Sequence, residues 1–220
     1  KEFSRYWMHN GFLNIDNRKM SKSLGNFFTV REISEKYDLQ VLRFFMLSAH
    51  YRSPLNFSAE LMEAAKSGLE RIITAADRLK FLMGSAKTED MAETEAEKFA
   101  KSAEYVGNFE SAMDDDFNTA DAIAAVFDLV KFINTMTDED SSKEYLENLF
   151  DRLVRLTEVL GIIVDKEDEI LDSDIEALIA ERQAARKEKN FARADEIRDE
   201  LLAKGIVLKD TREGVQWKRA

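Results

Sequence analysis

The sequence of 220 residues contains no cysteine, so the chain can form no disulfide bond and cannot by itself build a thiolate zinc site. It also lacks any uninterrupted apolar run as long as a membrane span, and its first residues, KEFSRYWMHNG, lack the apolar centre of a secretory signal. We therefore expect a cytoplasmic protein with no membrane partner. A hydrophobic content of 45% is sufficient to bury a core in one large domain or two small ones.

An overall excess of positive charge is also lacking, since the formal net charge is −11. Residues 61–175 carry 28 acidic against 12 basic side chains, a net charge of −16, whereas residues 1–60 and 176–220 carry net charges of +3 and +2. The acidic centre would repel a long nucleic acid lying flat on it. We therefore expect phosphate contacts near the two ends of the chain and few in its middle.

Apolar residues recur at spacings of three and four through the acidic middle, which predicts amphipathic helices. The first helix should begin after Ser58 and stop at Gly84. Three further helices are expected over about 97–109, from Asn118 or Thr119 onward, and over 141–160. Four such helices with short connections indicate a helical bundle over residues 58–165.

A separate pattern follows the bundle. Ser173 with Glu176 forms a capping-box pattern that would open a helix, and Asn190 could cap another. Two short apolar runs after Gly205 predict a small hairpin. We therefore expect a small α+β unit over residues 173–220.

The segment NIDNRKMSKSLGNFFTV, residues 14–30, is rich in glycine, serine and asparagine, which predicts a loop with many hydrogen-bond donors. Its two lysines, Lys19 and Lys22, suit a phosphate group. A solvated lysine turn is the simpler interpretation when the segment is taken in isolation.

The string YWMHNGFLNIDNRKMSKSLGNFFTVREI resembles the second signature of class I aminoacyl-tRNA synthetases, and its flanks resemble the cysteinyl-tRNA synthetases in particular. HYRSPLNFS, AMDDDFNTADA and KNFARADEIRDELLAKGIVLKD resemble the same family and follow in the expected order. A lone KMSKS would indicate class I only, whereas four ordered segments identify the member.

The resemblance implies a mainly α fold in three parts. Residues 1–57 would hold the KMSKS loop and the stem-contact region of a Rossmann-type catalytic domain. Residues 58–165 would form a helical bundle of the anticodon-binding type, and residues 173–220 a small α+β anticodon-recognition unit.

The resemblance also implies a reaction, in which ATP with Mg²⁺ activates cysteine for transfer to tRNA-Cys. Pyrophosphate leaves when the cysteine carboxylate attacks the α-phosphorus, and lysines on a closing loop can stabilise the charge that builds on the leaving group. The family assigns this role chiefly to Lys22, with Lys19 assisting. Ser21, Ser23 and Gly25 would let the loop approach and move.

The segment His9-Asn10-Gly11-Phe12 faintly resembles the first class I signature, but it lacks the final histidine and lies too close to Lys19. We place His9 on a strand approaching the loop. There it either lines the adenosine pocket of ATP or makes a structural hydrogen bond.

The first signature and the zinc ligands of the family have no counterpart in the sequence. Because the chain starts at Lys1 without methionine, we expect a piece of a longer protein, inactive alone, with the zinc ligands upstream. The three carboxylates of DDDFNT, residues 114–119, could bind a divalent metal, but a helix start favours acidic residues without one. No residue of this chain is assigned to a metal.

The resemblance places anticodon reading on Arg186, Phe191, Asp195 and Asp210. Unpaired bases are read by stacking on aromatic side chains and by hydrogen bonds to base edges. Phe191 could alternatively be an apolar staple holding two helices together.

Two further basic features each have two possible interpretations. Arg182, Arg186, Lys189 and Arg193 would form a basic stripe if one helix continued through them, or a solvated charged face if it does not. Arg52, beside the single proline Pro54, could contact the sugar-phosphate backbone near the inner acceptor arm, or it could form an interdomain salt bridge.

Two other functions stay open at this point. A ligase that joins cysteine to an amino-sugar shares the catalytic signatures but has no reason to keep an anticodon unit. A free-standing tRNA-binding module has no reason to keep the KMSKS loop. We expect a monomer whose partners are tRNA-Cys, ATP and cysteine.

Overall fold

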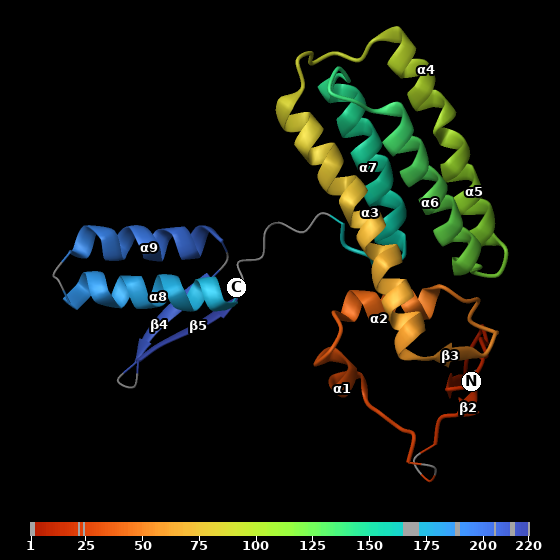
Figure 1. Cartoon of the computed structure of the whole chain (residues 1–220), viewed down its shortest axis with the longest axis horizontal. Coiled ribbons are helices and arrows are strands. Elements are labelled where there is room, and N and C mark those ends of the chain that lie inside the picture. The colour runs from red at the N-terminus through yellow and green to blue at the C-terminus, as the bar shows by residue number, and fades with distance from the viewer. Residues whose placement is uncertain are drawn as a thin grey trace. The chain divides into compact units, whose positions relative to one another are not determined.

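The computed structural model describes residues 3–219 except 22, 24, 165–171, 188–189, 205 and 212–213; for residues 172–176, 207, 209–211 and 214–219 it describes the backbone alone. The chain forms two compact units, Lys1–Asp165 and Lys166–Ala220, which are treated separately (Figure 1).

The first unit opens with short strands and helices, which are β1 (Leu13–Ile15), β2 (Arg18–Lys19), α1 (Val30–Ser34), α2 (Leu39–Leu47) and β3 (Leu55–Phe57). The sheet has the order β2-β1-β3, in which β1 runs antiparallel to β2 and parallel to β3. The parallel register pairs Leu13 with Leu55 and Ile15 with Phe57, so this small sheet joins segments 42 residues apart.

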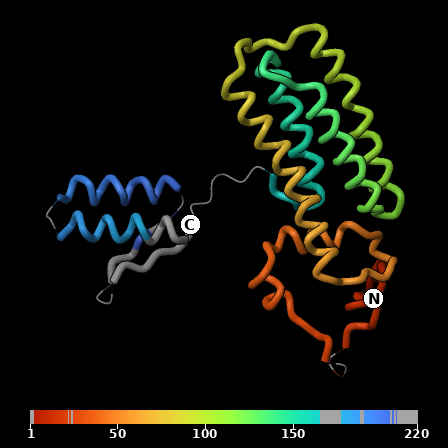
Figure 2. The backbone as a smooth tube through the Cα atoms, viewed as in Figure 1, coloured from red at the N-terminus to blue at the C-terminus, as the bar shows by residue number. Residues whose placement is uncertain are grey.

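The remainder of the first unit is the expected helical bundle, made of α3 (Ala59–Ser85), α4 (Glu93–Lys101), α5 (Ala103–Asp114), α6 (Thr119–Met136) and α7 (Lys143–Val159). Helix α3 runs from the N-terminal elements to the far end of the bundle (Figure 2). The predicted caps Ser58 and Asn118 are confirmed, because their side chains accept hydrogen bonds from the backbone of Leu61 and Asp121. The mainly α fold class is therefore confirmed.

The expected single helix over 97–109 is wrong, because α4 and α5 are separate helices that meet at Ser102. Arg152 of α7 donates to the carbonyl of Phe99 over 2.9 Å and also contacts the Ser102 hydroxyl. Its guanidinium lies 3.8 Å from the centre of the Phe99 ring. A side chain that inserts into the end of a helix competes for its carbonyls and bends the chain. The first helix also ends one residue later than predicted, at Ser85.

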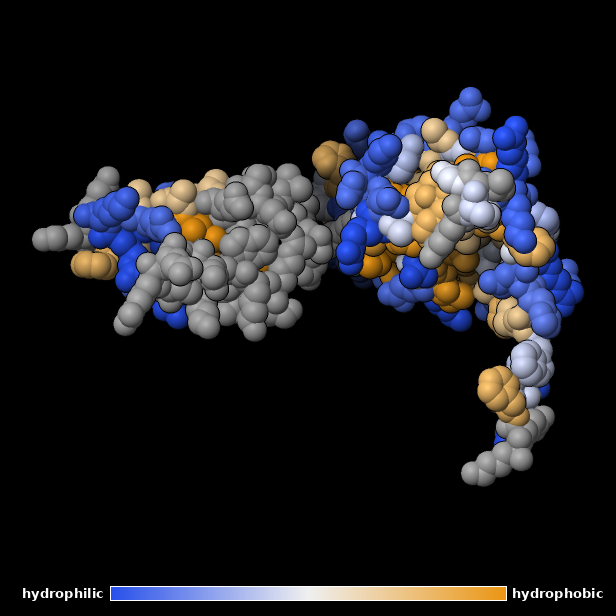
Figure 3. All heavy atoms as spheres, turned by 90° about the horizontal axis from the view of Figure 1, so that it is seen from below, coloured by the Kyte–Doolittle hydropathy of each residue, from blue (hydrophilic) through white to orange (hydrophobic). Residues whose placement is uncertain are grey.

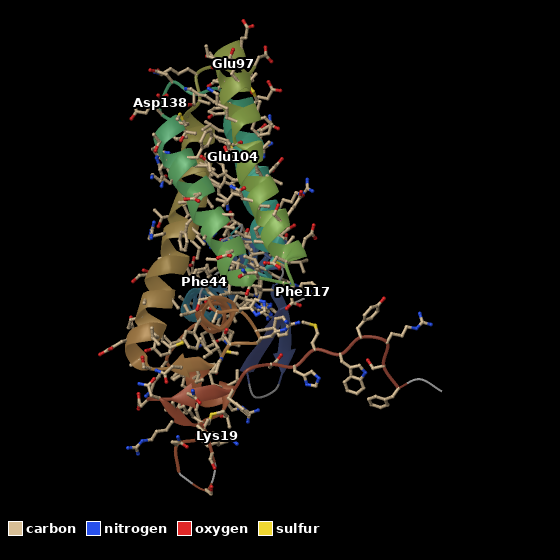
Figure 4. All side chains as sticks on the ribbon, turned by 90° about the vertical axis from the view of Figure 1, so that its right-hand side faces the viewer. Lys19, Phe44, Glu97, Glu104, Phe117 and Asp138 are labelled. Carbon is tan, nitrogen blue, oxygen red and sulfur yellow. The ribbon has the colours of Figure 1, made fainter. Side chains whose placement is uncertain are left out.

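The core of the first unit is continuous from α2 into the bundle. Val41, Phe44 and Phe45 of α2 are buried in the same cluster as the apolar faces of α3, α6 and α7. The rings of Phe44 and Phe127 meet edge to face with centroids 6.2 Å apart. This packing fixes the N-terminal elements on one end of the bundle (Figure 4).

The second unit consists of α8 (Asp172–Lys187), α9 (Phe191–Ala203), β4 (Ile206–Thr211) and β5 (Gly214–Arg219). The helices pack against each other, and β4 and β5 form the predicted antiparallel hairpin. Asn190 caps α9 as predicted, whereas α8 begins at Asp172, one residue before the expected cap Ser173. Ile179, Ile197, Leu201 and Ile206 form the small core.

Several large apolar side chains stay exposed in the N-terminal elements. Figure 3 shows hydrophobic side chains gathered on this face of the first unit, with hydrophilic ones around them. The exposed apolar residues before α3 are Phe3, Tyr6, Trp7, Met8, Phe12, Phe27, Val30, Leu39 and Met46. Among the helices that the structure describes, none is both long and apolar enough to cross a membrane.

Candidate functional site

The KMSKS segment starts from a tight hairpin between β1 and β2. Asp16 and Asn17 form its turn with φ angles of 48° and 61°. Left-handed backbone at both central residues is typical of the hairpin turn that matches strand twist, and Asp and Asn tolerate it. The amide of Asn17 donates to the side-chain oxygen of Asn56 over 2.7 Å, which ties the turn to β3.

Asn26 closes the base of the loop that follows. Its side-chain oxygen accepts from the amide of Ser21 over 2.9 Å, and its side-chain nitrogen donates to the carbonyl of Lys19 over 3.2 Å. The hydroxyls of Ser21 and Ser23 lie 2.7 Å apart. Gly25 has a φ of 68°, in the region that glycine adopts without strain.

Of the two lysines of the loop, the structure describes Lys19 only. Lys19 is exposed, and its amine lies 5.1 Å from the centre of the Phe12 ring. Figure 4 shows Lys19 at the end of the first unit that is opposite Asp138. Lys22 lies outside the described residues. The roles predicted for Lys19, Ser21, Lys22 and Ser23 in pyrophosphate release stay predictions.

His9 does not lie on a strand, so this expectation was wrong. The described backbone between Arg5 and Phe12 is irregular, β1 begins only at Leu13, and the His9 side chain is exposed. The expectation came from the position of His9 before the KMSKS loop in the family, whereas strand pairing in the described residues begins only at β1. Its contact with ATP stays a prediction.

A carboxylate of the bundle, Asp116, holds the segment that precedes β3. The hydroxyl of Tyr51 donates to Asp116 over 2.9 Å, and a guanidinium nitrogen of Arg52 lies 2.9 Å from its other oxygen. The imidazole of His50 lies 3.7 Å from the same carboxylate and stacks on the Tyr51 ring. The hydroxyl of Tyr51 and the charge of Asp116 raise the pKa of Arg52. The salt bridge considered for Arg52 is therefore present, although its side chain is still 65% exposed.

The backbone on both sides of this contact has special geometry. Asp116 and Phe117 both have a φ of 56°, a region that is disfavoured for a bulky residue such as phenylalanine. On the other side, a Cβ atom at Gly11 would lie 2.3 Å from the carbonyl oxygen of Ser53, and the Gly11 amide donates to the carbonyl of Tyr51 over 2.7 Å. Only glycine fits at Gly11, whereas the disfavoured backbone at Phe117 has to be held by the tertiary contacts around it.

In the second unit, the predicted base-stacking residue faces solvent. Phe191 is 60% exposed, so it is not an apolar staple between the helices. Asp195 is exposed one turn later on the same face of α9. Arg186 is also exposed, near the end of α8. The backbone of Asp210 lies in β4, and its side chain is outside the described residues.

The possible basic stripe is not present, because the helix breaks between α8 and α9. Arg182 is buried, with 5% of its surface exposed. Arg193 is paired with Glu181 and Glu196 at 2.9 and 2.8 Å, and these carboxylates, Glu196 first, raise its pKa. Lys189 lies outside the described residues.

Comparison with protein families divides the chain into three matched segments. A model of the class I (C) tRNA synthetase catalytic domain matches residues 1–67, a DALR domain matches residues 108–164, and a cysteinyl-tRNA ligase anticodon-binding domain matches residues 168–217. A cysteine–tRNA ligase from Lachnospira eligens is 66% identical over 99% of this chain. The chain belongs to the cysteinyl-tRNA synthetase family.

Two further relatives of this cysteinyl-tRNA synthetase chain have the same description. The ligases of Lachnoclostridium phytofermentans and Clostridioides difficile are 54% and 52% identical over the whole chain. The chain covers 46%, 48% and 47% of these three relatives, so it spans about half their length. The anticodon-domain match at residues 168–217 disfavours an amino-sugar ligase, and the catalytic-domain match disfavours a free-standing tRNA-binding module.

One solved structure supports the fold alone. A LeuRS from Agrobacterium radiobacter K84, solved in a ternary complex with tRNA and LeuAMS, aligns with a TM-score of 0.57 and 20% identity. The alignment covers 72% of this chain and 22% of that one.

Two residues of this cysteinyl-tRNA synthetase chain were missed as site residues by the sequence analysis. The position of Asn26 close to the KMSKS pentad was a signal in the sequence. Its two hydrogen bonds, to Ser21 and Lys19, could not be predicted because they depend on how the loop folds back. Asp116 belongs to DDDFNT, which suggested a helix start, and its partner Tyr51 is 65 residues away.

Proposed function

We propose that this chain supplies the pyrophosphate-facing loop and the tRNA-reading parts of a cysteine–tRNA ligase. The observation that carries the proposal is the 66% identity, over nearly the whole chain, with a cysteine–tRNA ligase. We assign three functional parts: residues 1–57 to the catalytic domain, 58–165 to the bundle and 173–220 to the anticodon-binding unit.

In this proposal, the loop acts on ATP during the activation of cysteine. Lys22, assisted by Lys19, stabilises the negative charge that develops on the pyrophosphate oxygens as the cysteine carboxylate attacks the α-phosphorus. The two bonds of Asn26 to the base of the loop support the position of Lys19, because they join its carbonyl to the other limb. Ser21 and Ser23 supply short polar side chains at the tip, and His9 lies towards the adenosine.

The proposed tRNA contacts lie at two places. Phe191 stacks on an anticodon base, while Asp195, Arg186 and Asp210 contact base edges or the adjoining backbone. Exposure of Phe191 and its spacing of four from Asp195 support this assignment. Arg52 contacts the backbone near the acceptor arm, since its guanidinium is largely exposed while Asp116 holds one edge.

The remaining proposals concern cofactors and assembly. ATP would act with Mg²⁺. The described residues contain no group of three or more histidine, aspartate or glutamate side chains fit for a metal, and the chain has no cysteine, so they do not fit the family's zinc. We expect a cytoplasmic protein, because translation consumes charged tRNA in that compartment, and we expect it to be a monomer.

The test of this function is the affinity of the chain for tRNA-Cys after substitution of the stacking residue. Base–aromatic stacking contributes about 1–3 kcal/mol per base, so Phe191→Ala should weaken binding roughly 5- to 150-fold. The measurement is a fluorescence titration with labelled tRNA-Cys at one fixed salt concentration.

The matched control is Phe81→Ala, which removes a phenylalanine that is 73% exposed in the bundle. This variant should bind tRNA-Cys as the unchanged chain does. Equal losses in both variants, or no loss in Phe191→Ala, would contradict the proposed role of Phe191.

A further inference from the structure

A polar groove lies on the bundle between α3 and α6, and none of its lining residues belongs to the sites described above. It has a volume of about 510 Å³. Its lining is rich in hydrogen-bond donors, which are Ser67, Arg71 and Thr74 on α3 and Lys131 and Asn134 on α6, while the hydroxyl of the lining residue Thr135 donates to the carbonyl of Lys131 over 2.8 Å. The α3 residues are spaced by four and three, so they share one face of that helix.

The two cations of the groove are not neutralised by acidic neighbours. In the part of the chain that the structure describes, neither Arg71 nor Lys131 has a carboxylate within 4.0 Å. The groove contains one acidic residue, Glu70, and its carboxylate lies 4.0 Å from the amine of Lys66.

Arg71 is held in place by an aromatic ring. Its guanidinium carbon lies 4.8 Å from the centre of the half-buried Phe127 ring. Phe127 is packed in turn by Phe44. This support orients the guanidinium without consuming its hydrogen-bond donors, which stay available to a ligand.

The groove contrasts with the net charge of the bundle. Residues 61–164 carry 22 acidic against 11 basic side chains, a net charge of −11, and acidic residues alone would repel a polyanion. Two unpaired cations amid hydroxyl and amide donors form a local exception. Hydroxyls, amides and cationic side chains are the groups that proteins use to bind phosphate oxygens.

We propose that the α3–α6 groove binds backbone phosphates of the tRNA, in addition to the anticodon contacts. The proposal rests on the proposed function, because it takes tRNA as the polyanion. No exposed aromatic side chain lines the groove among the described residues, so it should bind phosphates without reading bases. The middle of the chain would then contact phosphates although its net charge is negative.

The test measures the affinity of the full 220-residue chain for tRNA-Cys across a series of salt concentrations from roughly 50 to 200 mM. Arg71→Gln and Lys131→Gln should each weaken binding about two- to fivefold, and the double variant by about the product. Each single change should reduce the slope of log affinity against log salt by about 0.7–1. The control Lys101→Gln, an exposed lysine at the end of α4, removes the same charge and should leave both quantities unchanged.

Two further measurements distinguish phosphate binding from a packing role of Arg71 and from an acidic protein partner. Arg71→Lys should keep most of the slope, whereas a purely structural role in packing on Phe127 would make it resemble Arg71→Gln. Polyglutamate should compete poorly with tRNA; equal competition would overturn the proposal in favour of an acidic protein partner. Unchanged slopes in both glutamine variants would overturn it as well.

These measurements distinguish a failure of the groove proposal from a failure of the proposed function. If the groove variants behave like the unchanged chain while Phe191→Ala still weakens binding, only the groove assignment is wrong. If the chain binds no RNA even at the lowest salt, both proposals are overturned.

Discussion

At the residue scale, Glu95 shows how one buried carboxylate joins two helices. It is 8% exposed on α4 and accepts hydrogen bonds from the amide and hydroxyl of Ser142, at 2.9 and 2.6 Å, and from the amide of Ala92. Burial acts to raise the pKa of Glu95, but the bonds from Ser142 and Ala92 and the charge of Lys98 outweigh it, so the pKa is lowered. The carboxylate thus completes the starts of both α4 and α7.

This arrangement predicts a pH-dependent loss of stability. Glu95→Gln should lower the free energy of unfolding at neutral pH by about 1–3 kcal/mol, because charge-assisted bonds to two helix starts are lost. Because the pKa of Glu95 in the folded state is lower than the unfolded value near 4.5, its charge stabilises the fold fully above that value. This contribution disappears as the pH falls through the folded-state pKa. The difference between variant and unchanged chain in urea unfolding should therefore begin to shrink below about pH 4.5.

The control is Glu97→Gln, an exposed carboxylate on the same helix (Figure 4). It should change the free energy of unfolding by less than about 0.5 kcal/mol. A Glu95→Gln difference that is independent of pH would contradict the role given to the Glu95 charge.

At the element scale, the loop after β2 is defined by bonds that cross its base. Two bonds of Asn26 connect the limb at Lys19 and Ser21 with the limb after Gly25. The α1 helix then begins at a capping box in which Thr29 and Glu32 bond reciprocally. The two limbs at the base of the loop are therefore bounded by a hairpin on one side and a capped helix on the other.

Asn26→Ala should loosen this loop without unfolding the unit. The amide of Ser21 loses its acceptor, and at about 1 kcal/mol per bond its hydrogen exchange should accelerate roughly fivefold or more. The global free energy of unfolding should change by less than about 1 kcal/mol. Amide exchange read by NMR or mass spectrometry gives both quantities.

Ser23→Ala is the matched control, since it removes the contact between the Ser21 and Ser23 hydroxyls and leaves the Asn26 bonds intact. Ser21 exchange should stay slow in this variant. The assignment fails if Asn26→Ala leaves Ser21 exchange unchanged.

Elements with local signals were predictable from the sequence, and those that depend on distant partners were not. Ser58, Asn118 and Asn190 carry their own capping oxygen, so the starts of three helices could be predicted. The break at Ser102 has no glycine or proline to signal it and depends on Arg152, 50 residues away.

At the scale of the whole molecule, the uneven charge was visible in the sequence but its arrangement was not. The acidic surplus of residues 61–175 suggested a bundle with few phosphate contacts. Folding brings Arg71 and Lys131, 60 residues apart in the sequence, into one groove. Likewise, the hydrogen bond from Tyr51 to Asp116 joins the N-terminal elements to the bundle. Such sites depend on tertiary packing, which the helical periodicity does not specify.

In the proposed function, this chain reads the anticodon of tRNA-Cys. The most direct measurement compares binding of the chain to tRNA-Cys and to the same tRNA with a changed anticodon, at two salt concentrations. We predict that the anticodon change weakens binding roughly tenfold or more at both concentrations, because stacking and base-edge contacts are lost. Equal affinity for the two tRNAs, falling steeply with salt, would mean that the chain contacts phosphates only and does not read the anticodon.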